Sequence, residues 1–297
     1  MISRSTPLGS ALRRSVLTGA TLLALQAGNA VAQAGCPSDL EAATIAANHA
    51  AREAITPPPS MSMADAECGR EKLTRFLAQS QGAVVGYKAG LTNPAVQKRF
   101  GHDSPIRGTL FSGMILKDGA EIPARYGAKP IFEADLVVEV GDARINQAVT
   151  RADAMRHLSR IYPFIELPDL MVDDPSRLTG ASLVYLNVVA RLGVLGAPLD
   201  VASLQSPLDT LANMTVRLVD ESGKELDSAK GAAILGHPVD AVLWLIKDLK
   251  RAGITLKKGD LLSLGSFSKP LAPKSGSSAK AIYEGLPGTP SVSVRFQ

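Results

Sequence analysis

Two acidic side chains separated by one residue stand at the start of an apolar segment. Glu133 and Asp135 flank Ala134, and the apolar residues 136–138 follow directly. Because side chains alternate between the two faces of a β-strand, this spacing places both carboxylates on one face. Mg²⁺ and Mn²⁺ prefer carboxylate and water ligands, and a third carboxylate from elsewhere normally completes such a site. The pattern indicates either a metal site or an ordinary solvated strand face.

Glu166 is the candidate for the third metal ligand. It lies in the otherwise apolar run 164–167, where an unpaired charge would be costly. No Cys-x-x-Cys pair is present, so a thiolate zinc site is not expected. The chain also lacks the Gly-x-Ser-x-Gly elbow of many hydrolases and the glycine-rich patterns of nucleotide-binding loops.

Five different short motifs follow one another between about residue 80 and the C-terminal end. They are Gly86-Tyr87-Lys88-Ala89-Gly90-Leu91-Thr92, Gly108-Thr109-Leu110, Phe132-Glu133-Ala134-Asp135, Leu235-Gly236-His237-Pro238 and Gly265-Ser266. Together they resemble the 2-keto-4-pentenoate hydratase group of the fumarylacetoacetate hydrolase superfamily. The motifs are specific to the superfamily and less specific to one reaction within it.

This resemblance implies an α+β fold, namely a mixed β-sheet roll of the fumarylacetoacetate hydrolase C-terminal type with a helical N-terminal prelude. It also implies that Glu133, Asp135 and Glu166 bind Mg²⁺ or Mn²⁺, and that Lys88 is the catalytic cation beside the substrate. A small 2-oxo or dienol acid would be that substrate, and the enzyme would be a homo-oligomer.

Two further residues are expected to bind substrate. His237 precedes Pro238 at a predicted helix start, so it either contacts substrate or caps the helix. Ser266 follows an apolar strand and either binds the substrate carboxylate or satisfies a turn. Without its motif, Lys88 would be interpreted as a strand-edge lysine with a solvated head.

The chain departs from the hydratase pattern in ways that bear on the reaction. Typical hydratases carry Pro-Asp-Phe-Gly where this chain has Pro105-Ile106-Arg107-Gly108, so the acid expected there is Ile106. Asp103 or Arg107 is a possible substitute. The second metal acid is Asp135 rather than Glu, which shortens its reach. The first hypothesis is hydration of a 2-hydroxy-2,4-dienoate, and the alternatives are decarboxylation of a 4-oxalocrotonate-like diacid or a catalytically silent periplasmic binding protein.

The elements that must position these residues can be predicted from local patterns. Helices are expected over 39–54, 63–79, 151–161 and 238–252, and strands over 83–88, 136–140, 214–219 and 291–296. We expect a helical N-terminal segment at 35–81 and a catalytic domain at 82–297.

Residues 1–34 are predicted to be a signal peptide. Three arginines precede an apolar stretch that ends in Ala32-Gln33-Ala34, a small-residue cleavage pattern. Arg13-Arg14 also resembles a twin-arginine signal, and the alternatives are a membrane anchor or a lipoprotein acylated at Cys36. The expected location is the periplasm, with no membrane association after the leader is removed.

Composition agrees with an exported enzyme. Removing the three leader arginines lowers the formal net charge from +4 to +1, which argues against nucleic-acid binding. Cys36 and Cys68 are the two cysteines of the chain, and an oxidising compartment would favour a disulfide between them.

Overall fold

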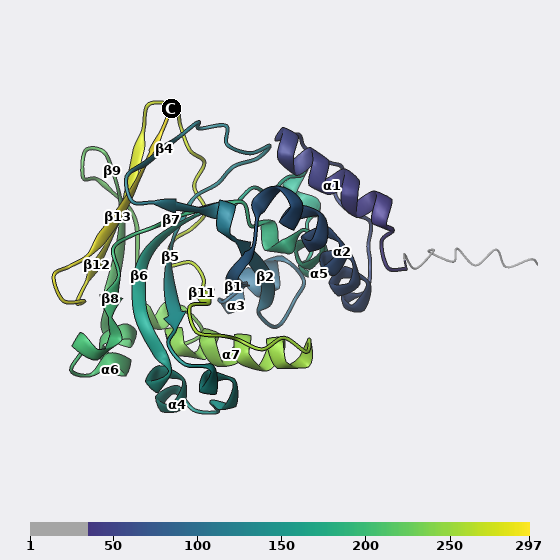
Figure 1. The fold of residues 1–297 in the computed structure, drawn as a ribbon. Coiled ribbons are helices and arrows are strands. Elements are labelled where there is room, and N and C mark those ends of the chain that lie inside the picture. The colour runs from purple at the N-terminus through teal and green to yellow at the C-terminus, as the bar shows by residue number, and fades with distance from the viewer. Residues whose placement is uncertain (1–34) are drawn as a thin grey trace, which may run out of the picture. The chain divides into compact units, whose positions relative to one another are not determined.

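The structure is a computed structural model that describes residues 35–297, and the predicted leader lies outside these residues. Over this range the chain forms an eight-stranded and a five-stranded β-sheet, with α-helices packed around them (Figure 1). Both sheets mix parallel and antiparallel pairs. The expected α+β class, with a mixed and curled β-structure, is therefore confirmed.

The larger sheet carries the predicted site residues. Its strands in spatial order are β2 (Ile106–Phe111), β1 (Val84–Gly90), β11 (Leu261–Ser263), β5 (Glu133–Val140), β6 (Leu158–Leu167), β7 (Leu192–Leu195) and β3 (Ile115–Lys117), with β8 (Leu199–Asp200) beside β6. β1 pairs in parallel with β11, and β3 with β7, whereas the other pairs are antiparallel. This order separates Lys88 on β1 from Glu166 on β6 by two strands.

The smaller sheet packs against one face of the larger one. Its strands in spatial order are β10 (Glu225–Lys230), β9 (Thr215–Asp220), β12 (Ser278–Glu284), β13 (Ser291–Phe296) and β4 (Ala120–Ile122). Alternate residues of β5, such as Leu136 and Val138, share one buried core with Leu218 and Ala281 of the smaller sheet. The period of two therefore turns the acidic residues of β5 toward the opposite face.

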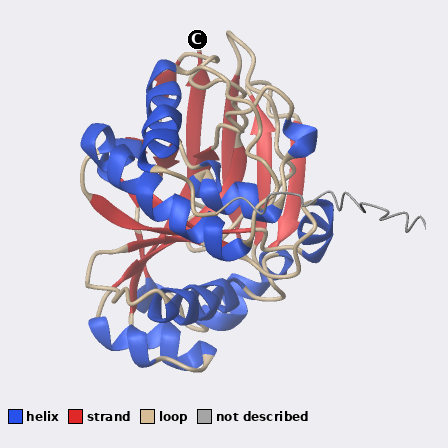
Figure 2. Cartoon of the chain, turned by 90° about the vertical axis from the view of Figure 1, so that its right-hand side faces the viewer, coloured by secondary structure: helices blue, strands red, loops and turns tan. Residues whose placement is uncertain are grey.

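The α-helices form two groups on different sides of the larger sheet (Figures 1 and 2). One group consists of α1 (Asp39–Ala51), α2 (Met63–Gln81) and α5 (Gly180–Tyr185). The other consists of α4 (Arg151–Arg156), α6 (Pro207–Asn213) and α7 (Pro238–Arg251), and α3 (Pro94–Arg99) connects β1 to β2. In the first group α2 packs on α1, α5 and β2, whereas α7 of the second packs on β1. The sheet edge at β2 thus lies between the two groups.

Short 3₁₀ helices complete the element order. They are η1 (Ser112–Met114), η2 (Ala143–Gln147), η3 (Pro175–Arg177), η4 (Asn187–Val189), η5 (Val201–Ser203) and η6 (Gly231–Ala233). No helix within residues 35–297 is long and apolar enough to span a membrane.

A disulfide ties the start of the described chain to the first group of helices. Cys36 and Cys68 are bonded with an S–S distance of 2.02 Å, which links the segment before α1 to α2. Helix α1 begins with a capping box in which Ser38 and Glu41 satisfy each other's backbone N–H groups. Its start is therefore fixed both covalently and by hydrogen bonds.

The predicted helix over 151–161 is wrong in its second half. Helix α4 ends at Arg156, and β6 begins at Leu158. The segment 158–167 pairs with β5 on one side and with β7 and β8 on the other. Its backbone groups are satisfied by neighbouring strands that are distant in sequence, which overrides the local helical preference. The other three predicted helices and all four predicted strands are present, with shifted ends except for the strand over 291–296.

Candidate active site

The three predicted metal ligands lie on one face of the larger sheet. Glu133 of β5 stands directly opposite Glu166 of β6, and Asp135 follows two residues along β5. Side chains that are directly opposed on antiparallel strands have Cβ atoms about 4.5–5.5 Å apart. The negative charge of Glu166 also raises the pKa of both Glu133 and Asp135. The structure therefore brings the three carboxyl groups together.

Lys88 reaches the same place from β1. Its ammonium group forms a buried ion pair with Glu166 Oε1 and donates a hydrogen bond to the carbonyl oxygen of Val188 at 3.1 Å. In a flat sheet β1 and β6 would be roughly 14 Å apart, since neighbouring strands are about 4.8 Å apart. The contact shows how far the sheet curls around this face. Lys88 is therefore not a solvated strand-edge lysine.

Gly108 makes room for the Lys88 side chain. It pairs with Lys88 across β1 and β2, and a Cβ atom at residue 108 would lie 2.9 Å from Lys88 Cγ. The same Cβ would lie 2.8 Å from the carbonyl oxygen of Asn187. A larger residue would displace either the lysine or the backbone of η4, which gives the Gly-Thr-Leu motif a physical reason.

Asp135 is held by three donors inside the protein. Its carboxylate accepts hydrogen bonds from the backbone N–H of Leu136 at 2.5 Å, Ser263 Oγ at 2.8 Å and the backbone N–H of Gly265 at 3.1 Å. Burial and then the nearby charge of Glu166 raise the pKa of Asp135 to about 7, while the Ser263 hydrogen bond opposes this shift. Ser263 was not predicted from the sequence, because its contact with Asp135 runs between the neighbouring strands β11 and β5 and no local spacing indicates it.

Glu133 is the acid best suited to exchange a proton. Burial, followed by the charge of Glu166, raises its pKa to about 7, and the hydroxyl of Ser266 acts in the opposite direction. A pKa near the operating pH is the condition that general acid–base catalysis favours. Unlike Asp135, which is fully buried, Glu133 keeps partial exposure. In the metal-free protein this carboxyl group can therefore gain or lose a proton near neutral pH.

The carboxylates of Glu133, Asp135 and Glu166 are ligands that suit a hard divalent cation. Their present orientations, however, do not form a metal site. Three crowded carboxyl groups face one ammonium group, so a cation would offset their repulsion. Within residues 35–297, however, no three His, Cys, Asp or Glu side chains are already placed to hold a metal ion. Glu166 is turned to Lys88, and Asp135 to Ser263 and Gly265. Metal binding would require these two carboxylates to rotate away from their present partners.

The segment η4 contacts Lys88 and has an unusual backbone conformation. Asn187, Val188 and Val189 have φ values of 54°, 52° and 49°, in the left-handed region that L-residues rarely adopt. The Asn187 side chain accepts from Thr109 N–H at 2.7 Å and donates to Thr109 C=O at 2.9 Å. The Asn187 side chain thus satisfies the backbone groups of β2 as a neighbouring strand would. The carbonyl oxygen of Val188 accepts a hydrogen bond from Lys88. Strained backbone of this kind is often retained at functional sites.

Residue 106 is Ile where typical hydratases have Asp, and neither Asp103 nor Arg107 takes the place of that acid. The Ile106 side chain is buried and faces Gly90, on the Lys88 side of β2. Arg107 points away by the strand period and forms an ion pair with Asp248 at 2.5 Å. Asp103 is exposed in the loop before β2. The interpretation that Asp103 or Arg107 replaces the acid is therefore not supported.

His237 has a structural role at the start of α7. Its Nδ1 accepts from the backbone N–H of Val239 at 3.0 Å, and its Nε2 lies 3.0 Å from the carbonyl oxygen of Leu208. Both ring nitrogens are thus engaged in fixing α7 against α6. The helix-capping alternative describes His237 in this structure, and substrate contact by this residue stays a prediction that both engaged ring nitrogens disfavour.

Ser266 lies at the edge of the cluster in a turn. Its hydroxyl donates to the carbonyl oxygen of Ser268 at 2.7 Å and accepts from the Ser268 N–H at 3.1 Å. It also lowers the pKa of Glu133. The turn role and contact with the site therefore coexist in this residue, whereas contact with a substrate stays a prediction.

Solved structures of similar fold were found by comparison. The chain superposes on 4-oxalocrotonate decarboxylase from Pseudomonas putida G7, complexed with magnesium and adipate, with a TM-score of 0.77 and 21% identity over 89% of this chain and 100% of the other. Fumarylpyruvate hydrolase from Pseudomonas aeruginosa, complexed with Mn²⁺ and pyruvate, gives a TM-score of 0.52 and 14% identity over 71% and 89%. At these identities the likeness establishes the fold of the fumarylacetoacetate hydrolase superfamily.

Curated relatives narrow the class further, although no family model matches the chain. It is 31% identical to 2-keto-4-pentenoate hydratase of Burkholderia vietnamiensis over 73% of this chain and 80% of that protein. It is 32% identical to 2-keto-4-pentenoate hydratase 2 of Dechloromonas aromatica over 68% and 75%. A 2-hydroxyhexa-2,4-dienoate hydratase of Comamonas testosteroni is 27% identical over 79% and 87%. The chain belongs to the 2-keto-4-pentenoate hydratase family.

Proposed function

We propose that this protein is a hydro-lyase that adds water to a 2-hydroxy-2,4-dienoate and gives a 4-hydroxy-2-oxo acid. The observation that carries the proposal is the meeting of Lys88 with Glu133, Asp135 and Glu166 on one face of the sheet. Its relatives by sequence are named as hydratases of 2-keto-4-pentenoate and 2-hydroxyhexa-2,4-dienoate. A catalytically silent binding protein is disfavoured because these named relatives are enzymes.

We infer that Glu133, Asp135 and Glu166 hold a divalent cation, with Mg²⁺ or Mn²⁺ as the expected ion. Carboxylate ligands suit both ions, and the similar folds described above are complexed with magnesium or Mn²⁺. When bound, such an ion supplies chelation of the acid's carboxylate and C2 oxygen and stabilises negative charge there. The rotation of Glu166 that this requires would also release Lys88 for the substrate.

The remaining chemistry falls to the protein's own side chains. The reaction delivers two protons to carbon, at C3 and C5. One comes from the 2-hydroxyl group and the other from the water whose hydroxide adds to C4, so the site must move protons near neutrality. Glu133 has a pKa that burial raises to about 7 in the metal-free protein, but as a metal ligand it would be deprotonated, because a bound cation favours the charged carboxylate. Lys88 places a buried positive charge beside the acid, where it stabilises negative charge that grows as protons move. Ser263 and the Gly265 N–H hold Asp135 in the metal-free protein, and they would lose this contact when Asp135 turns to the cation.

A product assay with purified protein tests this function. The protein is incubated with Mg²⁺ and either 2-hydroxypenta-2,4-dienoate or a 4-oxalocrotonate-like diacid, and the products are identified by mass. Formation of the 4-hydroxy-2-oxo acid supports hydration. Release of CO₂ from the diacid as the main reaction would instead establish the decarboxylase alternative, and absence of turnover with both would refute the proposal.

A pair of variants shows whether the named site performs the reaction. Glu166→Gln should reduce turnover strongly because it removes both the partner of Lys88 and a metal ligand. Glu139→Gln is the matched control, since Glu139 lies on β5 but contacts Ser159 and Tyr162 instead. Equal activity losses in the two variants would contradict the assignment of the site.

A further inference from the structure

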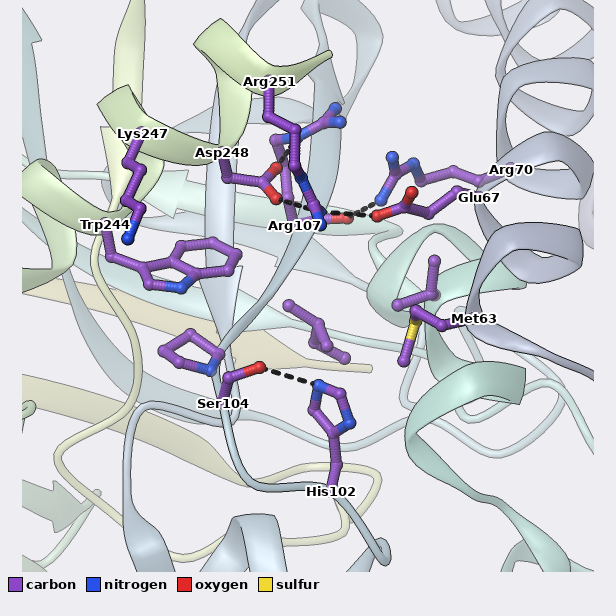
Figure 3. A pocket seen from close by; sticks show the side chains of 13 residues that line it. Met63, Glu67, Arg70, His102, Ser104, Arg107, Trp244, Lys247, Asp248 and Arg251 are labelled. Atoms are coloured by element: carbon purple, nitrogen blue, oxygen red, sulfur yellow. Dashed lines mark hydrogen bonds and ion pairs between the residues drawn. The ribbon is translucent and has the colours of Figure 1, made fainter.

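A cavity of about 510 Å³ lies between α2, α7 and the loop that precedes β2 (Figure 3). None of the four residues Lys88, Glu133, Asp135 and Glu166 lines it. Its volume is within the range of small-molecule sites, which is about 300–1,000 Å³. The cavity is therefore a second candidate site, distinct in its lining from the carboxylate cluster.

Positive charge predominates in this cavity. Arg70, Arg107, Lys247 and Arg251 line it, together with the two acids Glu67 and Asp248. Both acids are already engaged by these cations. Asp248 accepts from Arg107 at 2.5 Å and from Arg251 at 2.7 Å, and Glu67 accepts from Arg251 at 2.8 Å.

Arg70 is the cation of this group without an acidic partner. Its side chain is buried, and it donates one hydrogen bond, at 3.0 Å, to the carbonyl oxygen of Arg107. Within residues 35–297 it forms no salt bridge with any carboxylate within 4.0 Å. Burial, followed by the charge of Arg107, lowers its pKa to about 10. A buried guanidinium group has five N–H donors, so Arg70 retains capacity to bind an anion.

Apolar side chains supply much of the remaining lining, namely Met63, Ile106, Val184 and Trp244. Figure 3 shows Arg70, Glu67, Asp248 and Arg251 at one end of the cavity, the hydrogen-bonded pair His102 and Ser104 at the other, and Trp244 between them. A cationic end beside apolar walls matches a ligand with a carboxylate head and a short hydrocarbon chain. Inorganic phosphate would use the cationic end alone.

We propose that this cavity binds the carboxylate of a small aliphatic acid at Arg70, with the hydrocarbon chain packed against Trp244 and Ile106. The planar guanidinium group suits bidentate recognition of a carboxylate. The charge of the incoming anion compensates a buried cation that has no acidic partner in the described chain. This binding does not depend on the proposed hydratase reaction.

The position of Ile106 leaves two sources for that carboxylate. Ile106 lines the cavity and lies two residues along β2 from Gly108, which pairs with Lys88. A ligand held at Arg70 and packed on Ile106 can therefore either extend toward the carboxylate cluster or end within the cavity. The carboxylate is therefore either the distal group of a diacid substrate or the single group of a separate acid.

Trp244 provides a direct reporter, since it is the one tryptophan in the chain and it lines the cavity. Hexanoate and adipate are titrated into the metal-free protein and the Mg²⁺-loaded protein while the tryptophan fluorescence is recorded. We expect a saturable change with an organic acid and a weaker response to phosphate. Arg70→Gln should raise the Kd at least tenfold. Arg75→Gln is the matched control on the same helix, because Arg75 is exposed and pairs with Asp39.

Comparison of the ligands separates the two sources. Hexanoate binding that needs Arg70 but neither Mg²⁺ nor Glu133 identifies a separate acid site. Adipate binding that needs Arg70, Mg²⁺ and Glu133 identifies the distal end of the substrate site. Equal Kd values in Arg70→Gln and wild type, with circular dichroism showing both folded, would overturn the proposal even if hydratase activity is intact. So would the absence of a fluorescence change and of calorimetric binding for both acids.

Discussion

The buried ion pair between Lys88 and Glu166 connects the stability of the protein to its proposed chemistry. Both side chains are nearly inaccessible, so each charge depends on the other for compensation. Removing one partner of a buried pair typically costs about 3–5 kcal/mol, because the remaining charge is left without compensation. A loss of activity in a single variant could therefore arise either from unfolding or from the missing charge. A double variant tests whether unfolding is the cause, when its kcat is compared with that of Glu166→Gln alone, because Glu166 is also a proposed metal ligand.

Lys88→Met is expected to lower kcat about 10²- to 10³-fold, which is the usual cost of removing one preorganised charge-stabilising group. It should also lower the free energy of unfolding because Glu166 loses its counter-charge. In Lys88→Met/Glu166→Gln, denaturant unfolding should show partial recovery of stability while kcat stays low. Recovery of kcat together with stability would mean that Lys88 has only a structural role.

The raised pKa values of Glu133 and Asp135 predict a pH-dependent stability of the metal-free protein. Both groups have a folded pKa of about 7, above the ordinary values of 4.5 and 3.8, so the folded state binds protons more tightly than the unfolded state. Stability is then full below about pH 4 and is lost as the pH rises toward 7, by an amount on the order of a few kcal/mol. Urea unfolding in EDTA should show this decline.

Two comparisons check the origin of this pH effect. Glu133→Gln should flatten the decline because its side chain no longer titrates. Mg²⁺ should restore stability above pH 7 by binding the deprotonated carboxylates, if the site holds the ion. The lowered pKa of His49, which burial brings to about 4, acts in the opposite direction below pH 6.5, so the comparison of variants is decisive. An identical pH dependence in Glu133→Gln and wild type would contradict the shift assigned to Glu133.

At the level of elements, η4 determines how the site is closed. Three successive left-handed residues cost energy, of order 1–2 kcal/mol for each L-residue, so other contacts must compensate. Asn187 provides two of these contacts through its paired hydrogen bonds to Thr109. In this geometry the Val188 carbonyl accepts from Lys88, so a strained turn is coupled to the proposed catalytic cation.

Asn187→Ala should destabilise the fold by about 2–5 kcal/mol, because it leaves the buried N–H and C=O of Thr109 without partners. It should also reduce kcat more than it changes KM, since the Val188 carbonyl that orients Lys88 loses its support. Asn213→Ala is a suitable control, because the Asn213 side chain makes one exposed hydrogen bond at the end of α6. A change within about 0.5 kcal/mol for Asn187→Ala would show that η4 is held by other contacts.

The local patterns predicted the elements whose residues carry their own signal. The strand over 291–296 and the helix over 238–252 have clear period-two and period-3.6 patterns, and β13 and α7 are observed there. Strand β6 was not predicted, and its first four residues were assigned to a helix, because its backbone partners on β5, β7 and β8 are distant in sequence. Local propensity does not encode such pairings.

The acids and the lysine of the candidate site could be predicted from the sequence, whereas the residues that position them could not. Glu133, Asp135, Glu166 and Lys88 were named from spacing and from family motifs, and the structure places them together. The roles of Asn187 and of Ser263 depend on contacts across the sheet, which no local spacing indicates. The same holds for His237, whose structural role became evident only with its contact to Leu208.

For the whole molecule, the disulfide bears on where the protein is made and kept. Cys36 and Cys68 close a loop with a sequence separation of 32, and disulfides persist mainly in oxidising compartments. A loop of this size is expected to contribute roughly 3–4 kcal/mol by restricting the unfolded chain. We therefore propose that the mature protein acts in the periplasm after loss of residues 1–34.

Export can be tested by the intact mass of protein from a periplasmic extract. The expected species begins near Gly35 and is two hydrogens lighter than the reduced mature chain, because Cys36 and Cys68 are bonded. An acylated Cys36 would have no sulfur free for this bond, so a lipid mass at the N-terminus would establish the lipoprotein alternative. A full-length cytoplasmic species with two free thiols as the sole product would refute export. Arg13→Lys/Arg14→Lys should block export if a twin-arginine system is used, and should leave it intact if the protein crosses unfolded.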